Sequence, residues 1–197
     1  MAVTAADVQK LREMTGAGMM DCKKALTESG GDFDKAVDYL RTKGLQTVDK
    51  KAGRATDQGI IQAYIHPGSR LGVLVEINCE TDFVARTPDF QNFAKDVAMQ
   101  IAASKPIAVR REDVPQHIVE HELEIYRAQA REQGKPENVI ERMIGGKLEK
   151  FYQENCLLEQ AFVKNPDMTI RDYLNQTISK LGENIVIKRF VRYQLGE

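Results

Sequence analysis

A chain of 197 residues, of which 42% are hydrophobic, is long enough to bury one or two apolar cores without the support of disulfides. Its 28 Lys and Arg residues nearly cancel its 29 Asp and Glu residues, so no overall field would draw it to nucleic acid or to an anionic membrane. No apolar run reaches the roughly 18–20 residues of a membrane-spanning helix, and no signal-peptide pattern is seen, so we expect a cytoplasmic protein.

Residues 1–45, called the N-terminal module below, predict three short helices. Residues 4–7 have the spacing of a capping box at the start of the first helix. Asp32 can cap the third helix, which Gly44 is expected to end. The more polar and basic residues 46–58 then predict a linker that contains a short helix.

Residues 59–197 predict a second, larger domain. Residues 60–65 and 71–77 read as two strands joined by a tight turn, which indicates a β-hairpin. A helix that begins at Pro88 carries an apolar stripe able to cover one face of this hairpin. Residues 111–154 predict two charged helices that form a helical hairpin.

The end of the chain predicts one more helix and one more strand. Residues 169–172 match a capping box, and Gly182 is placed to end the helix that follows. Residues 185–195 alternate apolar and polar side chains, as in a strand with one buried face. Together with the early hairpin this strand gives a small three-stranded antiparallel sheet covered by helices, so the predicted fold class is α+β.

One short motif suggests a metal. His117, Glu120 and His121 match the H-x-x-E-H pattern, in which two histidines one turn apart hold zinc and the glutamate polarises water. The match lies in a charged helix, so a solvated helix face explains it better. The three cysteines lack paired spacing and read as buried thiols in a reducing compartment. We therefore expect no enzyme, no metal and no cofactor, with a zinc hydrolase as the enzymatic alternative.

Residues 81–84 (Thr-Asp-Phe-Val), called the tip below, follow the second predicted strand directly. Asp is a poor strand residue and an exposed Phe leaves apolar area in water, so the tip suits neither a core nor an ordinary loop. In one interpretation Asp82 caps backbone amides and Phe83 folds back onto the core. In the other, the pair is an exposed recognition element. The residue types alone favour the first.

Two adjacent methionines begin the second predicted helix. Because neighbouring helical positions point about 100° apart, Met19 and Met20 cannot both be equally buried in so small a module. An outward-facing methionine, with Leu11 and Arg12 on the preceding helix, would make an adaptable docking patch. The alternative is that both methionines pack under the glycine turn before them.

Four segments together resemble the elongation factor Ts family. They are residues 11–13, 15–26 (TGAGMMDCKKAL), 78–85 and 182–185, and the second of them is long and specific. The N-terminal module also resembles ubiquitin-associated domains. The resemblance extends over nearly the whole chain and implies a factor that promotes guanine-nucleotide exchange on elongation factor Tu.

The resemblance also implies which residues contact that partner. Four side chains would dock on the nucleotide-binding domain of elongation factor Tu: Leu11, Arg12, Met19 and Met20. The tip would intrude near the magnesium site of the partner with four others: Thr81, Asp82, Phe83 and Val84. No direct contact with nucleic acid or a membrane is implied.

The chain departs from the longer members of the family, which carry two core subdomains. Only one β-hairpin and one closing strand are visible here, so we expect residues 59–197 to pair two copies into a homodimer. An alternative of a different class remains: the N-terminal module would bind a ubiquitin-like protein, and the rest would be a scaffold without exchange activity.

Overall fold

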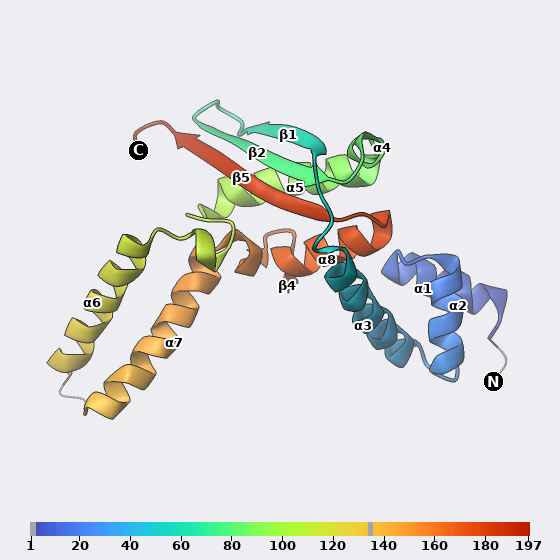
Figure 1. Ribbon diagram of the computed structural model, residues 1–197, viewed down its shortest axis with the longest axis horizontal. Coiled ribbons are helices and arrows are strands. Elements are labelled where there is room, and N and C mark those ends of the chain that lie inside the picture. The colour runs from blue at the N-terminus through green and yellow to red at the C-terminus, as the bar shows by residue number, and fades with distance from the viewer. Residues whose placement is uncertain (1–2, 134–135) are drawn as a thin grey trace. The chain divides into compact units, whose positions relative to one another are not determined.

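The computed structural model describes residues 3–133 and 136–197. The fold is α+β, as predicted, with a three-stranded antiparallel sheet and a separate two-stranded sheet (Figure 1). The chain divides into two compact units, each made of three segments that are separate in sequence. Unit 1 comprises Met1–Ile60, Asn78–Phe93 and Leu174–Val186, and unit 2 comprises Ile61–Ile77, Ala94–Tyr173 and Ile187–Glu197. Whether residues 1–45 form a domain of their own stays a prediction.

The N-terminal module consists of three helices, α1 (Ala5–Thr15), α2 (Met19–Glu28) and the first part of α3 (Phe33–Lys51). The predicted caps are confirmed. The Thr4 hydroxyl accepts from the Asp7 amide, Asp7 accepts from the Thr4 amide, and Asp32 accepts from the amide of Lys35. The module surrounds a small core made of Val8, Leu11, Cys22, Ala25, Leu26 and Ala36.

The prediction that Gly44 ends the third helix is wrong, because α3 continues to Lys51. Glycine lowers helix stability by about 1 kcal/mol but does not by itself stop a helix. Its role here is a close approach, since a Cβ at Gly44 would lie 3.0 Å from the Ser179 hydroxyl. The first part of the predicted linker is therefore helical, and irregular chain begins only after Lys51.

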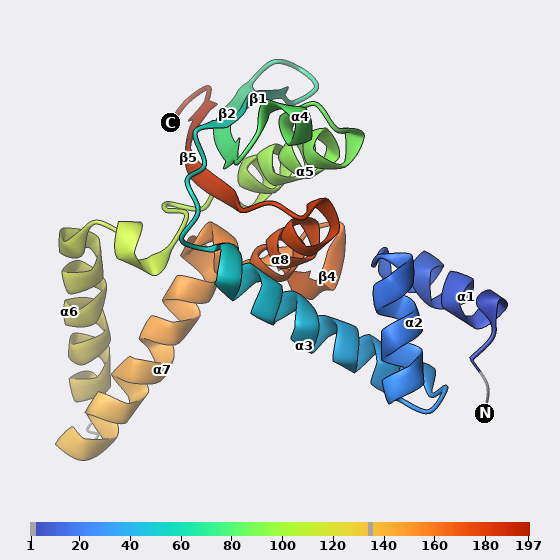
Figure 2. The same cartoon turned by 45° about the vertical axis from the view of Figure 1, so that its right-hand side comes forward.

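The three-stranded sheet has the order β1-β2-β5, formed by Gln58–Ile65, Leu71–Cys79 and Ile185–Gln194. The predicted hairpin and closing strand are thus confirmed. The single buried face expected for the closing strand is wrong, because Lys188 and Arg189 are both exposed and the pattern shifts there, which leaves Val191 and Tyr193 exposed. Helix α5 (Pro88–Ser104) lies along one face of the sheet (Figures 1 and 2). There the Arg192 side chain of β5 donates to the carbonyl of Ala102 in α5 (3.4 Å). Within the described parts of the chain, no helix covers the opposite face of the sheet in either view.

The predicted helical hairpin is formed by α6 (Gln116–Glu132) and α7 (Glu137–Asn155), which run side by side in both views. Its first helix begins at Gln116 rather than near residue 111, because Pro115 occupies the N-cap and residues 111–113 form a short 3-10 helix. The predicted connection at residues 134–135 lies outside the described residues. Arg111, in the short 3-10 helix, pairs with the carboxylate of Glu149 in α7 and with that of Glu159 just after α7.

A two-stranded antiparallel sheet, β3 (Ala161–Phe162) with β4 (Asn165–Thr169), was not predicted, because strands this short carry no readable alternation. The last helix, α8 (Ile170–Leu181), begins with the expected capping box and ends before Gly182, which has a positive φ of 77°. No helix within the described ranges is long and apolar enough to cross a membrane.

Candidate functional site

The tip forms a one-turn helix, α4 (Asp82–Ala85), directly after β2. Its N-cap is Thr81, whose hydroxyl accepts from the amide of Val84 (3.4 Å). Phe83 is not folded back onto the core, since 77% of the residue is exposed. The interpretation in which Asp82 caps the turn and Phe83 joins the core is therefore wrong. The ring stands in solvent, as a recognition element requires.

The charge of Asp82 also remains near water. Its carboxylate pairs with Arg86 one turn later, at 2.8 Å, and both side chains are largely exposed. Exposed pairs of this kind contribute less than about 1 kcal/mol, so the carboxylate is readily available to another cation or donor.

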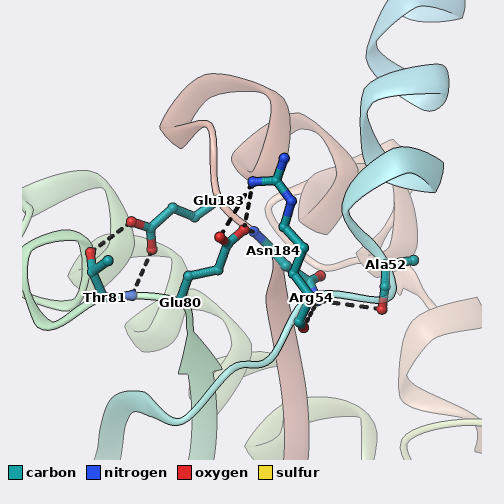
Figure 3. Close-up of polar contacts among 6 residues, drawn as sticks. All are labelled: Ala52, Arg54, Glu80, Thr81, Glu183 and Asn184. Carbon is teal, nitrogen blue, oxygen red and sulfur yellow. Dashed lines mark hydrogen bonds and ion pairs between the residues drawn. The ribbon is translucent and has the colours of Figure 1, made fainter.

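A carboxylate holds the start of the tip. The Glu183 side chain, in the loop between α8 and β5, accepts from the Thr81 amide (3.0 Å) and from the Thr81 hydroxyl (2.6 Å; Figure 3). Hydrogen bonds to an ionised group are shorter and stronger than neutral ones. Because Glu183 binds both donors of one residue, it fixes both the position and the side-chain rotamer of the cap.

A second contact runs in the opposite direction between the same two segments. Glu80 accepts from the backbone amide of Asn184 (2.6 Å) and lies 3.3 Å from the guanidinium of Arg54 (Figure 3). These contacts lower the pKa of Glu80, the amide of Asn184 more than Arg54. The contacts between residues 80–81 and 183–184 are therefore reciprocal, because a carboxylate of each segment accepts a hydrogen bond from a backbone amide of the other.

The buried thiol beside the tip is not suited to catalysis. Cys79 donates a hydrogen bond to the carbonyl of Thr81 (3.1 Å). Burial and, to a lesser degree, the nearby charge of Glu183 raise the pKa of Cys79 to about 11, so it stays protonated at neutral pH. Burial likewise raises the pKa of Cys156 to about 11. A thiol acts as a nucleophile only as the thiolate, so these cysteines are packing residues.

The predicted docking residues of the N-terminal module divide into two groups. Met19 and Met20 are both exposed, to 45% and 75%, so the alternative in which both pack under the glycine turn is wrong. Arg12 is also exposed, in the last turn of α1. Leu11, by contrast, has no exposed surface and belongs to the core of the module. Met14, which was not predicted, is 59% exposed nearby in sequence.

The zinc alternative gains no support. His117, Glu120 and His121 are all exposed on α6, and Glu120 accepts a hydrogen bond from Gln116 (2.6 Å). Among residues 3–133 and 136–197, no group of three or more His, Cys, Asp or Glu side chains is arranged to hold a metal ion.

Sequence reasoning did not assign a role to the residues that support the tip. Glu80, Glu183 and Asn184 were noted only as parts of segments shared with the family, and Arg54 only as part of the basic predicted linker. Their partners lie more than 20 positions away, so no local pattern connects them. The available signal was the position of two carboxylates, each beside a predicted strand end.

Comparison with known proteins gives a consistent result. The family model described as Elongation factor TS matches residues 6–197. Proteins named Elongation factor Ts are 62% identical in Carboxydothermus hydrogenoformans, 60% in Moorella thermoacetica and 61% in Geobacter sulfurreducens. These alignments cover 99%, 99% and 100% of this chain and 90%, 96% and 91% of the relatives. The chain belongs to the elongation factor Ts family.

Proposed function

We propose that this translation elongation factor binds elongation factor Tu in its GDP-bound form and promotes release of GDP, so that GTP can bind. The observation that carries the proposal is the exposed Phe83, presented on a single helical turn whose base is fixed by Glu183. A large exposed ring on a firmly held turn is suited to insertion into a partner, because little conformational freedom is lost on binding.

The mechanism acts on the metal that holds the nucleotide. Magnesium requires near-ideal octahedral geometry at about 2.0–2.1 Å, so a small displacement of its ligands weakens nucleotide binding strongly. We propose that the tip enters near this site and that Phe83 and Asp82 displace the elements that place the metal. No covalent bond is made or broken, so no catalytic residue is assigned.

Reciprocal coupling then releases the factor. A protein that lowers the affinity of its partner for nucleotide is itself bound less tightly when nucleotide is present. GTP that enters the emptied site therefore weakens the contact with this chain. We expect the cycle to take place in the cytoplasm, with binding to both the GDP-bound and the nucleotide-free partner.

Docking is assigned to the exposed side chains of the N-terminal module. Arg12, Met19 and Met20 supply a charge and two flexible thioether side chains, and Met14 is a further exposed apolar side chain of the module. Methionine adapts its shape to a partner surface at small conformational cost. Leu11 is buried in the module core, so we propose that it acts indirectly, by stabilising the module that carries this surface.

The test is release of a fluorescent GDP analogue from purified elongation factor Tu. Unchanged protein should accelerate release, and Phe83→Ala should reduce that acceleration by about tenfold or more, as expected for a central contact. Ile107→Ala is the matched control, because Ile107 is also an exposed large apolar residue but lies outside the proposed contacts. Binding without any acceleration by the unchanged protein would contradict exchange and favour the adaptor alternative.

We also propose that two copies pair through the face of the sheet opposite α5. Alternation along β1 and β2 places Ile61, Ile65 and Leu74 on this face. In β5 the alternation shifts by one residue at Lys188 and Arg189, which are both exposed, so Val191 and Tyr193 join the same exposed face. Glu76 and Arg189 form an ion pair (2.7 Å) among them. An apolar face with a paired charge is suited to a two-fold interface, in which each copy offers the same surface.

Light scattering across a range of protein concentrations tests the pairing. The unchanged chain should show twice the mass of the monomer, and Tyr193→Glu should shift the equilibrium toward monomer, because a charge would be buried at the interface. Ile107→Glu adds the same charge at another exposed apolar site and should leave the dimer intact. A monomer at every concentration would overturn the proposal.

A further inference from the structure

Asn184 contacts two segments that are far apart in sequence. Its side-chain amide donates to the backbone carbonyl of Arg54 (3.0 Å) and, at 3.5 Å, to that of Ala52 (Figure 3). Its backbone amide donates to Glu80 (2.6 Å). Only 5% of Asn184 is exposed, so water has little access to replace these bonds.

These contacts connect the end of α3 to the base of the tip. Ala52 is the C-cap of α3, the helix that begins in the N-terminal module and packs there against α1 and α2. Glu80 immediately precedes Thr81, the N-cap of the tip. One buried residue therefore connects the two segments: its side chain bonds the end of the helix that carries the docking module, and its backbone amide bonds the residue before the turn that carries Phe83.

A second asparagine holds the same irregular segment two residues further along the chain. The side-chain amide of Asn78, near the end of β2, donates to the carbonyl of Thr56 (3.1 Å). The remaining tie, between Arg54 and Glu80, is partly exposed and contributes less because water competes with it. The irregular chain after α3 is thus held by the side-chain amides of one buried and one partly buried asparagine, in addition to this surface ion pair.

We propose that Asn184 is a positioning residue for nucleotide exchange, which sets the tip relative to the end of α3 so that docking of the module brings Phe83 to the nucleotide site. The inference rests on the exchange function proposed above. When two contact elements are joined rigidly, engagement of the first places the second in a productive orientation. Loosening the joint lowers the maximal rate of release and leaves docking largely unchanged.

Asn184→Asp tests this with little change in shape. The backbone amide still donates to Glu80, but a carboxylate replaces the donor that faces the carbonyls of Ala52 and Arg54. Nucleotide release is measured over rising factor concentrations. The maximal rate should fall about fivefold to tenfold, the effect of one or two lost hydrogen bonds, while the half-saturating concentration changes less than about twofold.

Two comparisons identify the cause. Asn92→Asp, at an exposed position of α5, makes the same chemical change and should alter neither quantity. Met19→Ala combined with Met20→Ala should give the opposite pattern, a raised half-saturating concentration with a maximal rate near that of the unchanged protein. The two patterns separate positioning from docking.

A double-mutant cycle supplies the decisive readout. If Asn184 acts through the tip, Asn184→Asp should slow release strongly when Phe83 is present and have almost no further effect in the Phe83→Ala protein. If Asn184→Asp slowed release by the same ratio with and without Phe83, the inference would be overturned, because a general loss of folded protein reduces both rates by the same ratio. A denaturation curve for each variant reports the folded fraction.

Glu80→Ala is the second variant if Asn184→Asp does not fold. It removes the acceptor of the Asn184 amide from the other end of the connection and should lower the maximal rate in the same way. If the Glu80→Ala protein folds and accelerates nucleotide release from elongation factor Tu as much as the unchanged protein does, the inference is wrong. If the folded, unchanged protein fails to accelerate release, both the exchange proposal and the inference are overturned. If it accelerates release normally but Asn184→Asp slows release by the same ratio with and without Phe83, only the inference is overturned.

Discussion

The tip and the methionine surface of the N-terminal module both expose apolar side chains, but they are supported in different ways. Phe83 stands on a turn held by charged and buried polar contacts from Glu183 and Asn184. Met19 and Met20 begin a helix whose N-cap, Gly18, provides no side-chain hydrogen bond, and the module depends on a small apolar core. The polar support fixes one geometry, whereas the flexible methionines can adapt to a surface.

The largest expected effect comes from the apolar support of the module. Leu11→Ala should reduce the free energy of unfolding by about 2–5 kcal/mol, because a fully buried Leu leaves a cavity in a core of few residues. Chemical denaturation measures this. The neighbouring exposed Arg12→Ala should change stability by less than about 0.5 kcal/mol. A Leu11→Ala protein of normal stability would show that Leu11 does not support the module.

Removing the polar support of the tip should have an intermediate effect. Thr81→Val keeps the shape of the side chain but deletes the hydroxyl that donates to Glu183, which should cost about 1–3 kcal/mol of unfolding free energy and slow nucleotide release. Thr42→Val is the control, because that exposed hydroxyl donates to the carbonyl of Asp38 within its own helix. If the two variants lose equal stability, the bond to Glu183 gives the tip no special support.

The acid side of the stability curve tests the second polar contact. Because the pKa of Glu80 lies below its ordinary value of 4.5, its charge stabilises the fold above pH 4.5, and this contribution is lost as the pH falls through the lowered pKa. The stability difference between the unchanged protein and Glu80→Gln should therefore be constant near neutral pH and shrink below pH 4.5.

Urea denaturation at several pH values measures that difference. Other carboxylates with lowered pKa values are present in both proteins, so their effects cancel in the comparison; they are Asp7, Asp32, Glu149 and Glu197. A difference that stays constant down to pH 3 would show that the charge of Glu80 makes no net contribution to the fold.

How much of this could be read from the sequence depended on whether the signal was local. The capping boxes, the β-hairpin and the stripe of α5 were predictable, because each arises from residues a few positions apart. The prediction at Gly44 was wrong because the constraint on this position is not local: a Cβ there would crowd Ser179, 135 positions later. The exposed tip was recognised through resemblance to the family, since residue types alone favoured a turn folded onto the core.

The support of the tip was out of reach for the same reason. Glu183 and Thr81 are 102 positions apart, and Asn184 and Arg54 are 130 apart. A Glu or an Asn beside a strand end is common in any sequence, so neither residue type indicates a partner. Only folding brings these donors and acceptors together, and the predicted site therefore contained the side chains proposed to meet the partner but not those that hold them in place.

The smallest expected effect concerns the adaptable surface. Met20→Leu keeps the apolar volume but replaces an unbranched thioether by a stiffer branched chain, so unfolding free energy should change by less than about 0.5 kcal/mol. The half-saturating concentration in nucleotide release should rise about twofold, less than for Met20→Ala, because most of the apolar contact area is kept and only adaptability is lost. If Met20→Leu is as damaging as Met20→Ala, the surface demands a fixed fit, and the contrast with the firmly held tip would disappear.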